Sequence, residues 1–327
     1  MNLLKYGLRS RQRSQNAERR GRKKKEAERI KKEAELKQKL LEMKGWTKIP
    51  DMNTKRYGLG VAVGDGKLFA VGGYGSKSGE YLDLKNVDAG WKKIPDMMTE
   101  RRELGVAVGD GKLFAVGGYD GSNRHQSGEY LDLKNVDAGW KEIPDMNTER
   151  WGLGVAVGDG KLFAVGGMDD GSNRLKSGEY LDLKNVDAGW KKIPDMNTER
   201  RYLGVAVGDG KLFAVGGEDG NRLKSGEYLD LKNVDAGWKE IPDMNTERWG
   251  LGVAVGDGKL FAVGGYGSKS GEYLDLKNVD AGWKKIPDMN TKRRWLGVVV
   301  GDGKLFAVGG VDDSNYLKSG EYLRIAM

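Results

Sequence analysis

The hydrophobic pattern of this chain repeats along most of its length. A typical unit, 190–237, holds Val-Ala-Val within 204–208, Leu-Phe-Ala-Val within 211–216, and Glu-Tyr-Leu-Asp-Leu within 226–231. A Trp then opens the next segment, at 238–241. The first two runs do not alternate apolar and polar residues, so they predict short strands buried on both faces. These four segments are strands A, B, C and D of the unit.

Turn signals and spacing define how the strands are connected. Asp209-Gly210 separates strands A and B and favours a two-residue hairpin, because a type I′ turn needs positive φ at both central residues. Trp recurs at 46, 91, 140, 190, 238 and 283, at intervals of 45 to 50 residues. Six units of this period indicate a propeller or a solenoid. We therefore predict an all-β fold: a six-bladed β-propeller of four-stranded antiparallel blades.

The order of the strands also predicts how the ring closes. The first strand of the repeating region is a D strand at 46–50, whereas the last unit supplies A, B and C strands at 297–301, 304–309 and 320–325. We expect 46–50 to pair beside 321–324. This pairing would cover an edge strand that would otherwise be free to pair with another chain.

Three motifs of the unit resemble kelch repeats. They are Phe-Ala-Val-Gly-Gly, the Glu-Tyr-Leu-Asp that follows it, and Trp-Lys-Lys-Ile-Pro-Asp-Met with a later Arg, and the resemblance covers 46–327 in six copies. It implies the propeller fold and a protein-binding surface made by the B–C and D–A connections. Kelch units usually have Tyr where Leu229 stands, often His where Leu203 stands, and a shorter link to the Trp, so the resemblance transfers no particular ligand.

The differences between units are concentrated on one face. The A–B turn is Gly-Asp-Gly-Lys in all six units, and the C–D loop is Lys-Asn-Val-Asp-Ala-Gly in all five places where it occurs. In an up-and-down blade the B–C and D–A connections share the opposite face, and nine aromatic residues outside the repeating frame all lie there. We call this surface the variable face.

The variable face is the predicted partner-binding surface, because Trp, Tyr and Arg dominate binding hot spots. The candidates in the D–A connections are Tyr57, Arg102, Glu103, Trp151, Arg201, Tyr202, Trp249, Arg294 and Trp295, and those in the B–C connections are Tyr74, Tyr119, Arg174, Arg222, Tyr266 and Tyr316. The alternative is that these residues vary without functional meaning, because solvent-exposed loops tolerate changes in sequence. Aromatic-Gly alternates with Arg-X at a period of two units, which indicates a duplicated pair of units, and repeats this uniform are also typical of consensus engineering.

Few residues are available for catalysis or for metal binding. The chain has no Cys and a single His, His125, in a polar loop, so disulfides, thiolate chemistry and the copper-radical chemistry of some kelch-type oxidases are excluded. We expect no metal, no cofactor and no enzymatic activity. Glu80 and its five equivalents recur in every unit, which indicates a structural hydrogen bond. The alternative is a carbohydrate-active or isomerase-type kelch-like enzyme, which would need a carboxyl of shifted pKa, with Glu103 and Glu218 as candidates.

The charge divides the chain in two. Residues 1–44 carry 16 Lys and Arg against 6 Asp and Glu, a net charge of +10, whereas residues 45–327 carry a net charge of −2. We expect a basic arm over 1–44, helical over about 18–44, joined to a propeller at 45–327 that is monomeric. A basic cluster of the nuclear-import or nucleic-acid-contacting type comprises Arg19, Arg20, Arg22, Lys23, Lys24 and Lys25.

The arm also bears on partners and location. A polyanion is its natural partner, either nucleic acid or an acidic protein surface, and one alternative is a component of a larger nucleoprotein assembly anchored by the arm. Residues 1–17 are basic and have no acidic residue, which is weakly similar to a mitochondrial address. No run of about 18 apolar residues is present, so we expect no membrane span. We expect an intracellular protein, cytoplasmic or nuclear.

Overall fold

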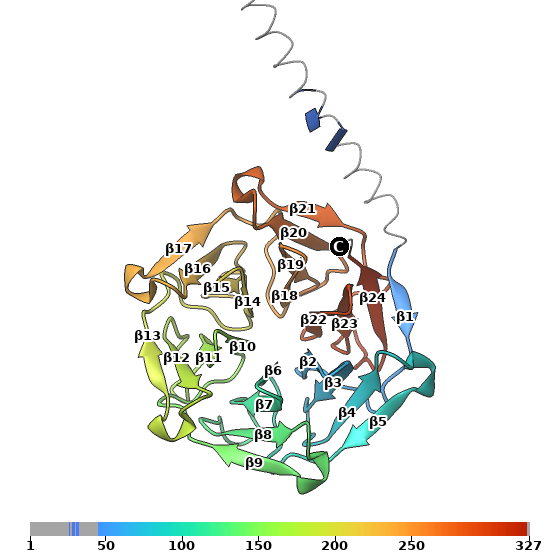
Figure 1. Ribbon diagram of the computed structural model, residues 1–327, viewed down its shortest axis with the longest axis vertical. Helices are drawn as coiled ribbons and strands as arrows, with labels where there is room; N and C mark the ends of the chain where they lie inside the picture. Colours follow the sequence, from blue (N-terminus) through green and yellow to red (C-terminus); the bar gives the residue numbers. More distant parts are fainter. Residues whose placement is uncertain (1–25, 27, 30, 33–44, 326–327) are drawn as a thin grey trace, which may run out of the picture. The chain divides into compact units, whose positions relative to one another are not determined.

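Residues 45–325 form six four-stranded antiparallel sheets around a central axis (Figure 1). The computed structural model describes these residues together with Glu26, Glu28, Arg29, Lys31 and Lys32. The predicted all-β, six-bladed propeller of four-stranded blades is therefore confirmed. No helix in the described part of the chain is long and apolar enough to cross a membrane.

Each sheet is one blade, with strand A innermost and strand D outermost (Figure 1). Blades 1 to 3 consist of β2 (Gly60–Gly64), β3 (Lys67–Val71), β4 (Gly79–Asp83) and β5 (Trp91–Ile94); β6 (Gly105–Gly109), β7 (Lys112–Val116), β8 (Gly128–Asp132) and β9 (Trp140–Ile143); and β10 (Gly154–Gly158), β11 (Lys161–Val165), β12 (Gly178–Asp182) and β13 (Lys191–Ile193). Blades 4 to 6 consist of β14 (Gly204–Gly208), β15 (Lys211–Val215), β16 (Gly226–Asp230) and β17 (Trp238–Ile241); β18 (Gly252–Gly256), β19 (Lys259–Val263), β20 (Gly271–Asp275) and β21 (Lys284–Ile286); and β22 (Gly297–Gly301), β23 (Lys304–Val308), β24 (Gly320–Arg324) and β1 (Thr47–Ile49). A 3₁₀ turn lies in each C–D loop, at η1 (Val87–Ala89), η2 (Val136–Ala138), η3 (Val186–Ala188), η4 (Val234–Ala236) and η5 (Val279–Ala281).

The ring closes as the strand order predicts. β1 is the outer strand of blade 6 and pairs antiparallel with β24, placing Lys48 opposite Glu321. The Trp46 indole N–H donates to the carbonyl of Pro287 at 2.8 Å, and the Asn290 amide donates to the carbonyl of Trp46 at 2.9 Å. The start and end of the propeller therefore share one sheet, and strand β24 has no open edge.

The hydrophobic core lies between neighbouring blades. Phe163 of blade 3 packs with Leu212 and Leu229 of blade 4, and all three are buried. The innermost strands approach one another closely: a Cβ added to Gly105 would lie 2.0 Å from a methyl carbon of Val155 in the next blade. Only glycine fits there, which explains why every A strand begins with this residue.

A buried ion pair repeats in all six blades and fixes the D–A connection. In blade 3, Arg150 contacts Glu179 at 3.1 Å and also donates to the carbonyl of Ser177 at 2.9 Å, while both side chains of the ion pair are about 1% exposed. The other oxygen of Glu179 accepts from the backbone and the side chain of Asn147, and that side chain also donates to the carbonyl of Trp190 at 3.1 Å. The structural role predicted for this recurrent glutamate is confirmed.

Blade 2 lacks one part of this network, which leads to a stability prediction. Met98 stands where the other blades have Asn, and it is 50% exposed. Met98→Asn is expected to stabilise the protein by about 1 kcal/mol, because the new amide reaches the carbonyl of Trp140 and the carboxylate of Glu129. Urea unfolding measures the change. Asn147→Met is the reciprocal control and should destabilise by a similar amount; a neutral result for both variants would contradict the role of the Asn.

Most of the arm lies outside the described residues. Glu26, Glu28, Arg29, Lys31 and Lys32 are in helical conformation, and Arg29 contacts Glu26 at 2.9 Å. The helix predicted over about 18–44 stays a prediction. The basic cluster at 19–25 also lies outside the described residues.

Candidate functional site

The nine extra aromatic residues of the variable face form one continuous network. Their ring centroids lie 4.3 to 6.1 Å apart from one ring to the next. Tyr202 is the central member and contacts three Trp rings. The network comprises Tyr57, Tyr74, Tyr119, Trp151, Tyr202, Trp249, Tyr266, Trp295 and Tyr316.

Backbone hydrogen bonds form a closed belt around the mouth of the central channel. One residue from each D–A connection donates its N–H to the carbonyl of the equivalent residue in the preceding blade, at 2.6 to 2.9 Å. All six residues have φ between 50° and 62°. This left-handed conformation suits glycine and strains other residues by about 1–3 kcal/mol each. The belt comprises Gly58, Glu103, Gly152, Tyr202, Gly250 and Trp295.

The alternation of small and large residues in this belt has a steric cause. A Cβ on Gly152 would lie 3.0 Å from the ring of Tyr202, and Cβ atoms on Gly58 and Gly250 would lie 3.1 Å from Glu103 and Trp295. Each large side chain thus lies across the glycine of the preceding blade. Packing therefore favours the two-blade period seen in the sequence, because a Cβ at each of these glycines would press on the large side chain of the next blade.

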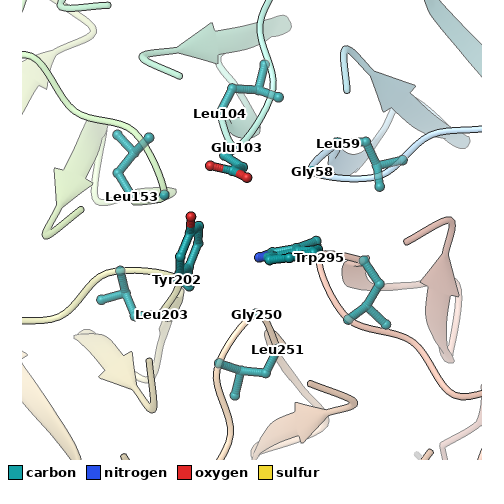
Figure 2. A pocket seen from close by; sticks show the side chains of 12 residues that line it. Gly58, Leu59, Glu103, Leu104, Leu153, Tyr202, Leu203, Gly250, Leu251 and Trp295 are labelled. Carbon is teal, nitrogen blue, oxygen red and sulfur yellow. The ribbon is translucent and has the colours of Figure 1, made fainter. Parts of the chain in front are cut away.

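The three large side chains converge over a pocket at the channel mouth. Figure 2 shows Glu103, Tyr202 and Trp295 reaching toward the axis from alternate blades, and the pocket volume is about 120 Å³. Six leucines, each 6% exposed, surround it. They are Leu59, Leu104, Leu153, Leu203, Leu251 and Leu296. Deeper in the channel the walls are valine and alanine side chains of the A strands.

Glu103 is the titratable group with the most unusual environment in this pocket. Burial raises the pKa of its carboxyl to about 7, while the positive charges of Arg102 and Arg201 and a hydrogen bond from Tyr202 lower it. Burial likewise raises the pKa of the Tyr202 hydroxyl. A carboxyl that titrates near neutral pH in a pocket can exchange protons with a ligand, so this feature is chemically significant.

The raised pKa predicts a pH-dependent stability. Because the folded state holds the Glu103 proton more tightly than the unfolded state, the favourable contribution is complete below about pH 4.5 and is lost as pH rises through about 7. Glu103→Gln should therefore melt above wild type at pH 8, by the equivalent of about 1–3 kcal/mol, and no higher than wild type at pH 4.5. Thermal melts at both pH values measure the difference. A difference independent of pH would contradict the assignment.

Three equivalent arginines next to the belt have two kinds of environment. Arg102 lies between the rings of Tyr74 and Tyr119, with its guanidinium carbon 4.7 and 4.8 Å from their centroids. Arg294 lies over Tyr266 and Trp295 at 4.8 and 4.7 Å. In contrast, Arg201 forms a close ion pair with Glu218 and also contacts the sulfur of Met168. Among the described residues, no carboxylate forms an ion pair with Arg102 or Arg294, so these two keep their charge available.

The other candidate arginines are paired. Arg174 contacts the carboxylate of Glu218 at 3.8 Å, and Arg222 contacts Glu247 at 4.0 Å while lying over the ring of Tyr266. Arg124 also lies on this face and binds Asp170 at 2.9 Å.

Unpaired polar atoms also concentrate on this face. Nine buried side-chain polar atoms of the described chain have no hydrogen-bond partner, and all belong to residues of the variable face. Seven are donors: the indole N–H groups of three Trp and the Nε–H groups of four Arg, namely Trp151, Trp249, Trp295, Arg102, Arg124, Arg174 and Arg294. Buried polar groups are normally paired. The face therefore offers donors to a ligand rich in acceptors.

The described residues do not form a recognisable metal centre. No group of three or more His, Asp or Glu in that part of the chain is placed to hold an ion. His125 lies 3.5 Å from Asp120. The Asp169 carboxylate accepts from the backbone and side chain of Asn173, so its loop is held by turn hydrogen bonds.

Sequence reasoning missed one member of the site. Met168 occupies the position that Tyr119 has in blade 2, and forms the same bridge with its own D–A connection. Comparing the units shows that Met168 is equivalent to Tyr119. Its contact with Arg201 could not be predicted in this way, because it joins side chains of two different blades.

The fold and its repeated loops define a β-propeller built from motifs of about 50 residues. The chain belongs to the kelch-repeat family, because the family model described as Kelch motif matches residues 100–147, 150–197, 199–245 and 294–324, more than half of the sequence. The chain is also similar to a solved structure titled "Structure of YjhT", with a TM-score of 0.73 and 14% identity, covering 85% of this chain and 97% of that chain. At this identity the similarity concerns the fold alone. Curated proteins give no match to the sequence.

Proposed function

We propose that the variable face is a non-catalytic protein-interaction surface that binds an acidic segment of a partner protein. The observation that carries this proposal is the environment of the arginines. Arg102 and Arg294 are stacked on aromatic rings and form no ion pair with a carboxylate in the described part of the chain, whereas Arg201 is neutralised by Glu218. Stacking holds a guanidinium fork in place, and a fixed fork binds carboxylates with little loss of side-chain entropy.

The surroundings of the two arginines support the same partner chemistry. Blades 2 and 6, which carry them, flank blade 1, and Tyr57 and Tyr74 of blade 1 contact each other and Tyr316 of blade 6. Tyr74 and Tyr316 are 53% and 46% exposed, which leaves their rings accessible to an apolar side chain. The seven unpaired donors complement the carboxylates and carbonyls of an acidic peptide.

Selection from a random peptide library tests this function directly. The library is displayed on phage and panned against the full-length protein, and we expect enrichment of Asp and Glu beside an apolar residue. Arg102→Gln/Arg294→Gln should weaken binding of a selected peptide by at least about tenfold in fluorescence anisotropy. The control Lys92→Gln/Lys191→Gln removes the same charge from exposed outer-strand positions and should change binding less than about twofold. Peptides without acidic residues, or binding that survives the arginine variant, would contradict the proposal.

The pocket at the channel mouth favours a second candidate function. A carboxyl with a pKa of about 7 beside Tyr202 is suited to general acid–base catalysis on a small substrate such as a sugar. Proton NMR of a panel of sugars and sugar acids incubated with the protein at pH 7 tests it. Turnover that Glu103→Gln removes would establish this function, whereas an unchanged panel would reject it.

For the arm we propose contact with a polyanion through phosphate groups, because residues 1–44 carry a net charge of +10. Engagement of four to six phosphates predicts a slope of roughly −3 to −5 for log K against log salt concentration. A salt titration of the full-length protein and of residues 45–327 on an oligonucleotide measures it. A flat dependence would favour a nuclear-import address or a protein-docking helix.

A further inference from the structure

The pocket at the channel mouth presents one unpaired hydrogen-bond acceptor and one unpaired donor. An oxygen of the Glu103 carboxyl and the indole N–H of Trp295 are buried and have no partner. Both belong to side chains that line the pocket, and Figure 2 shows the Trp295 nitrogen and the Glu103 carboxyl directed toward its centre. We propose that this pocket binds a primary carboxamide, whose NH₂ donates to Glu103 and whose carbonyl accepts from Trp295.

The belt leaves no competing backbone groups at this position. The N–H and the carbonyl of all six belt residues are used in hydrogen bonds from blade to blade. A ligand in the pocket therefore meets polar side chains and an apolar wall. The polar requirement is set by Glu103, by Trp295, and by the Tyr202 hydroxyl, which acts on Glu103 to lower its pKa.

Size and wall chemistry favour an amide on a short hydrocarbon stem. The pocket volume is about 120 Å³, several times the roughly 10–15 Å³ that one water needs on the same measure. The ring of leucines, each 6% exposed, gives a methylene stem an apolar surface to contact. The carbonyl and the amino group of a carboxamide are separate and coplanar, so each can meet its own partner.

Other small groups satisfy only part of the site. A carboxylate would be repelled by Glu103 once that residue is ionised. An ammonium would pair with Glu103 but would meet the positive N–H edge of Trp295. An alcohol must use one oxygen for both partners. The order of preference at pH 8 should be carboxamide, alcohol, and then either charged group.

Nuclear magnetic resonance of the indole N–H groups tests this order on the full-length protein. The ¹⁵N-labelled protein is titrated at pH 8 with propionamide, propanol, propionate and propylamine, and the Trp295 signal is the one absent from Trp295→Phe. We expect a saturable shift of this signal with propionamide, in the millimolar range, and at least tenfold weaker effects of propionate and propylamine. Equal effects of all four probes, or none with propionamide, would overturn the proposal.

A variant and a peptide pair complete the test. Glu103→Leu should abolish the propionamide shift, while Glu142→Gln, which alters an exposed carboxyl of the outer strand β9 far from the pocket, should preserve it. A loss in both variants would overturn the assignment. N-acetyl-Ala-Gln-Ala-N-methylamide and its Glu counterpart distinguish two sources of the carboxamide, a side chain of a partner protein and a free small molecule. Tighter binding of the Gln peptide than of propionamide indicates a partner's side chain. Weaker binding indicates a free small amide. The propionamide and Gln-peptide titrations involve no acidic residue in the ligand, so they stand or fall apart from the peptide selection.

Discussion

Deleting residues 1–52 is expected to destabilise the propeller by roughly 5 kcal/mol or more, because it removes three buried side chains as well as a strand. Trp46, Ile49 and Met52 are 6%, 6% and 1% exposed. The deletion also removes strand β1, which leaves the edge of β24 unpaired. An unpaired edge invites pairing with another chain. The truncated protein should therefore also self-associate.

Deletion of residues 1–44 is the matched control. It removes the arm but leaves Trp46 and β1 in place, so the melting temperature should stay within a few degrees of the full-length value. Thermal melts and light scattering of the three proteins measure stability and association. If both truncations melt alike, the closure of the ring by β1 contributes little, and the prediction is wrong.

The fold was predictable because its determinants are local. The Asp209-Gly210 turn, the apolar run of strand B and the regular spacing of Trp each identify a strand or a hairpin within a few residues. The turn adopts the expected conformation, with φ of 50° and 68° at these two residues. Six copies of one local pattern then left little freedom in topology, and the strand order determined the closing pair.

The chemistry of the variable face was predictable only in part. The excess of aromatic residues and arginines in the D–A and B–C connections marked the face, but their contacts join side chains of different blades. The stacking of Arg102 on Tyr74, for example, joins blades 2 and 1. Likewise, Glu103 acquires its raised pKa only because the closed ring directs it over the channel mouth. Such features depend on ring geometry and not on neighbouring residues in the sequence.

The alternation of glycine with large residues in the belt is a second feature that the sequence explains only in part. In the sequence it indicates duplication of a two-blade unit. In the structure, a Cβ on Gly152 would lie 3.0 Å from the ring of Tyr202, so a larger residue there would push against this ring. The same sequence period is thus consistent with duplication of a two-blade unit and with packing between neighbouring blades, and the sequence alone shows only the first.

The buried ion pairs lead to the second prediction of large effect. Glu179→Gln is expected to destabilise the protein by about 3–5 kcal/mol, because it leaves the Arg150 guanidinium buried without a counter-charge. Arg150 is also fixed by the carbonyls of Gly166 and Ser177, at 3.0 and 2.9 Å, so it cannot easily move to solvent. Urea unfolding at neutral pH measures the loss.

The repeats supply internal controls for this prediction. Glu227→Gln makes the same change in blade 4, where Arg200 contacts Glu227 at 3.1 Å, and should cost a similar amount. Asp159→Asn alters an exposed pair, in which Asp159 lies 4.0 Å from Lys161 and is 70% exposed, and should cost less than about 0.5 kcal/mol. A loss below about 1 kcal/mol at both buried sites would mean that water or the neighbouring carbonyls compensate the guanidinium charge. The recurrent glutamate would then be a simple hydrogen-bond acceptor, and the six ion pairs would not hold the D–A connections against the blades.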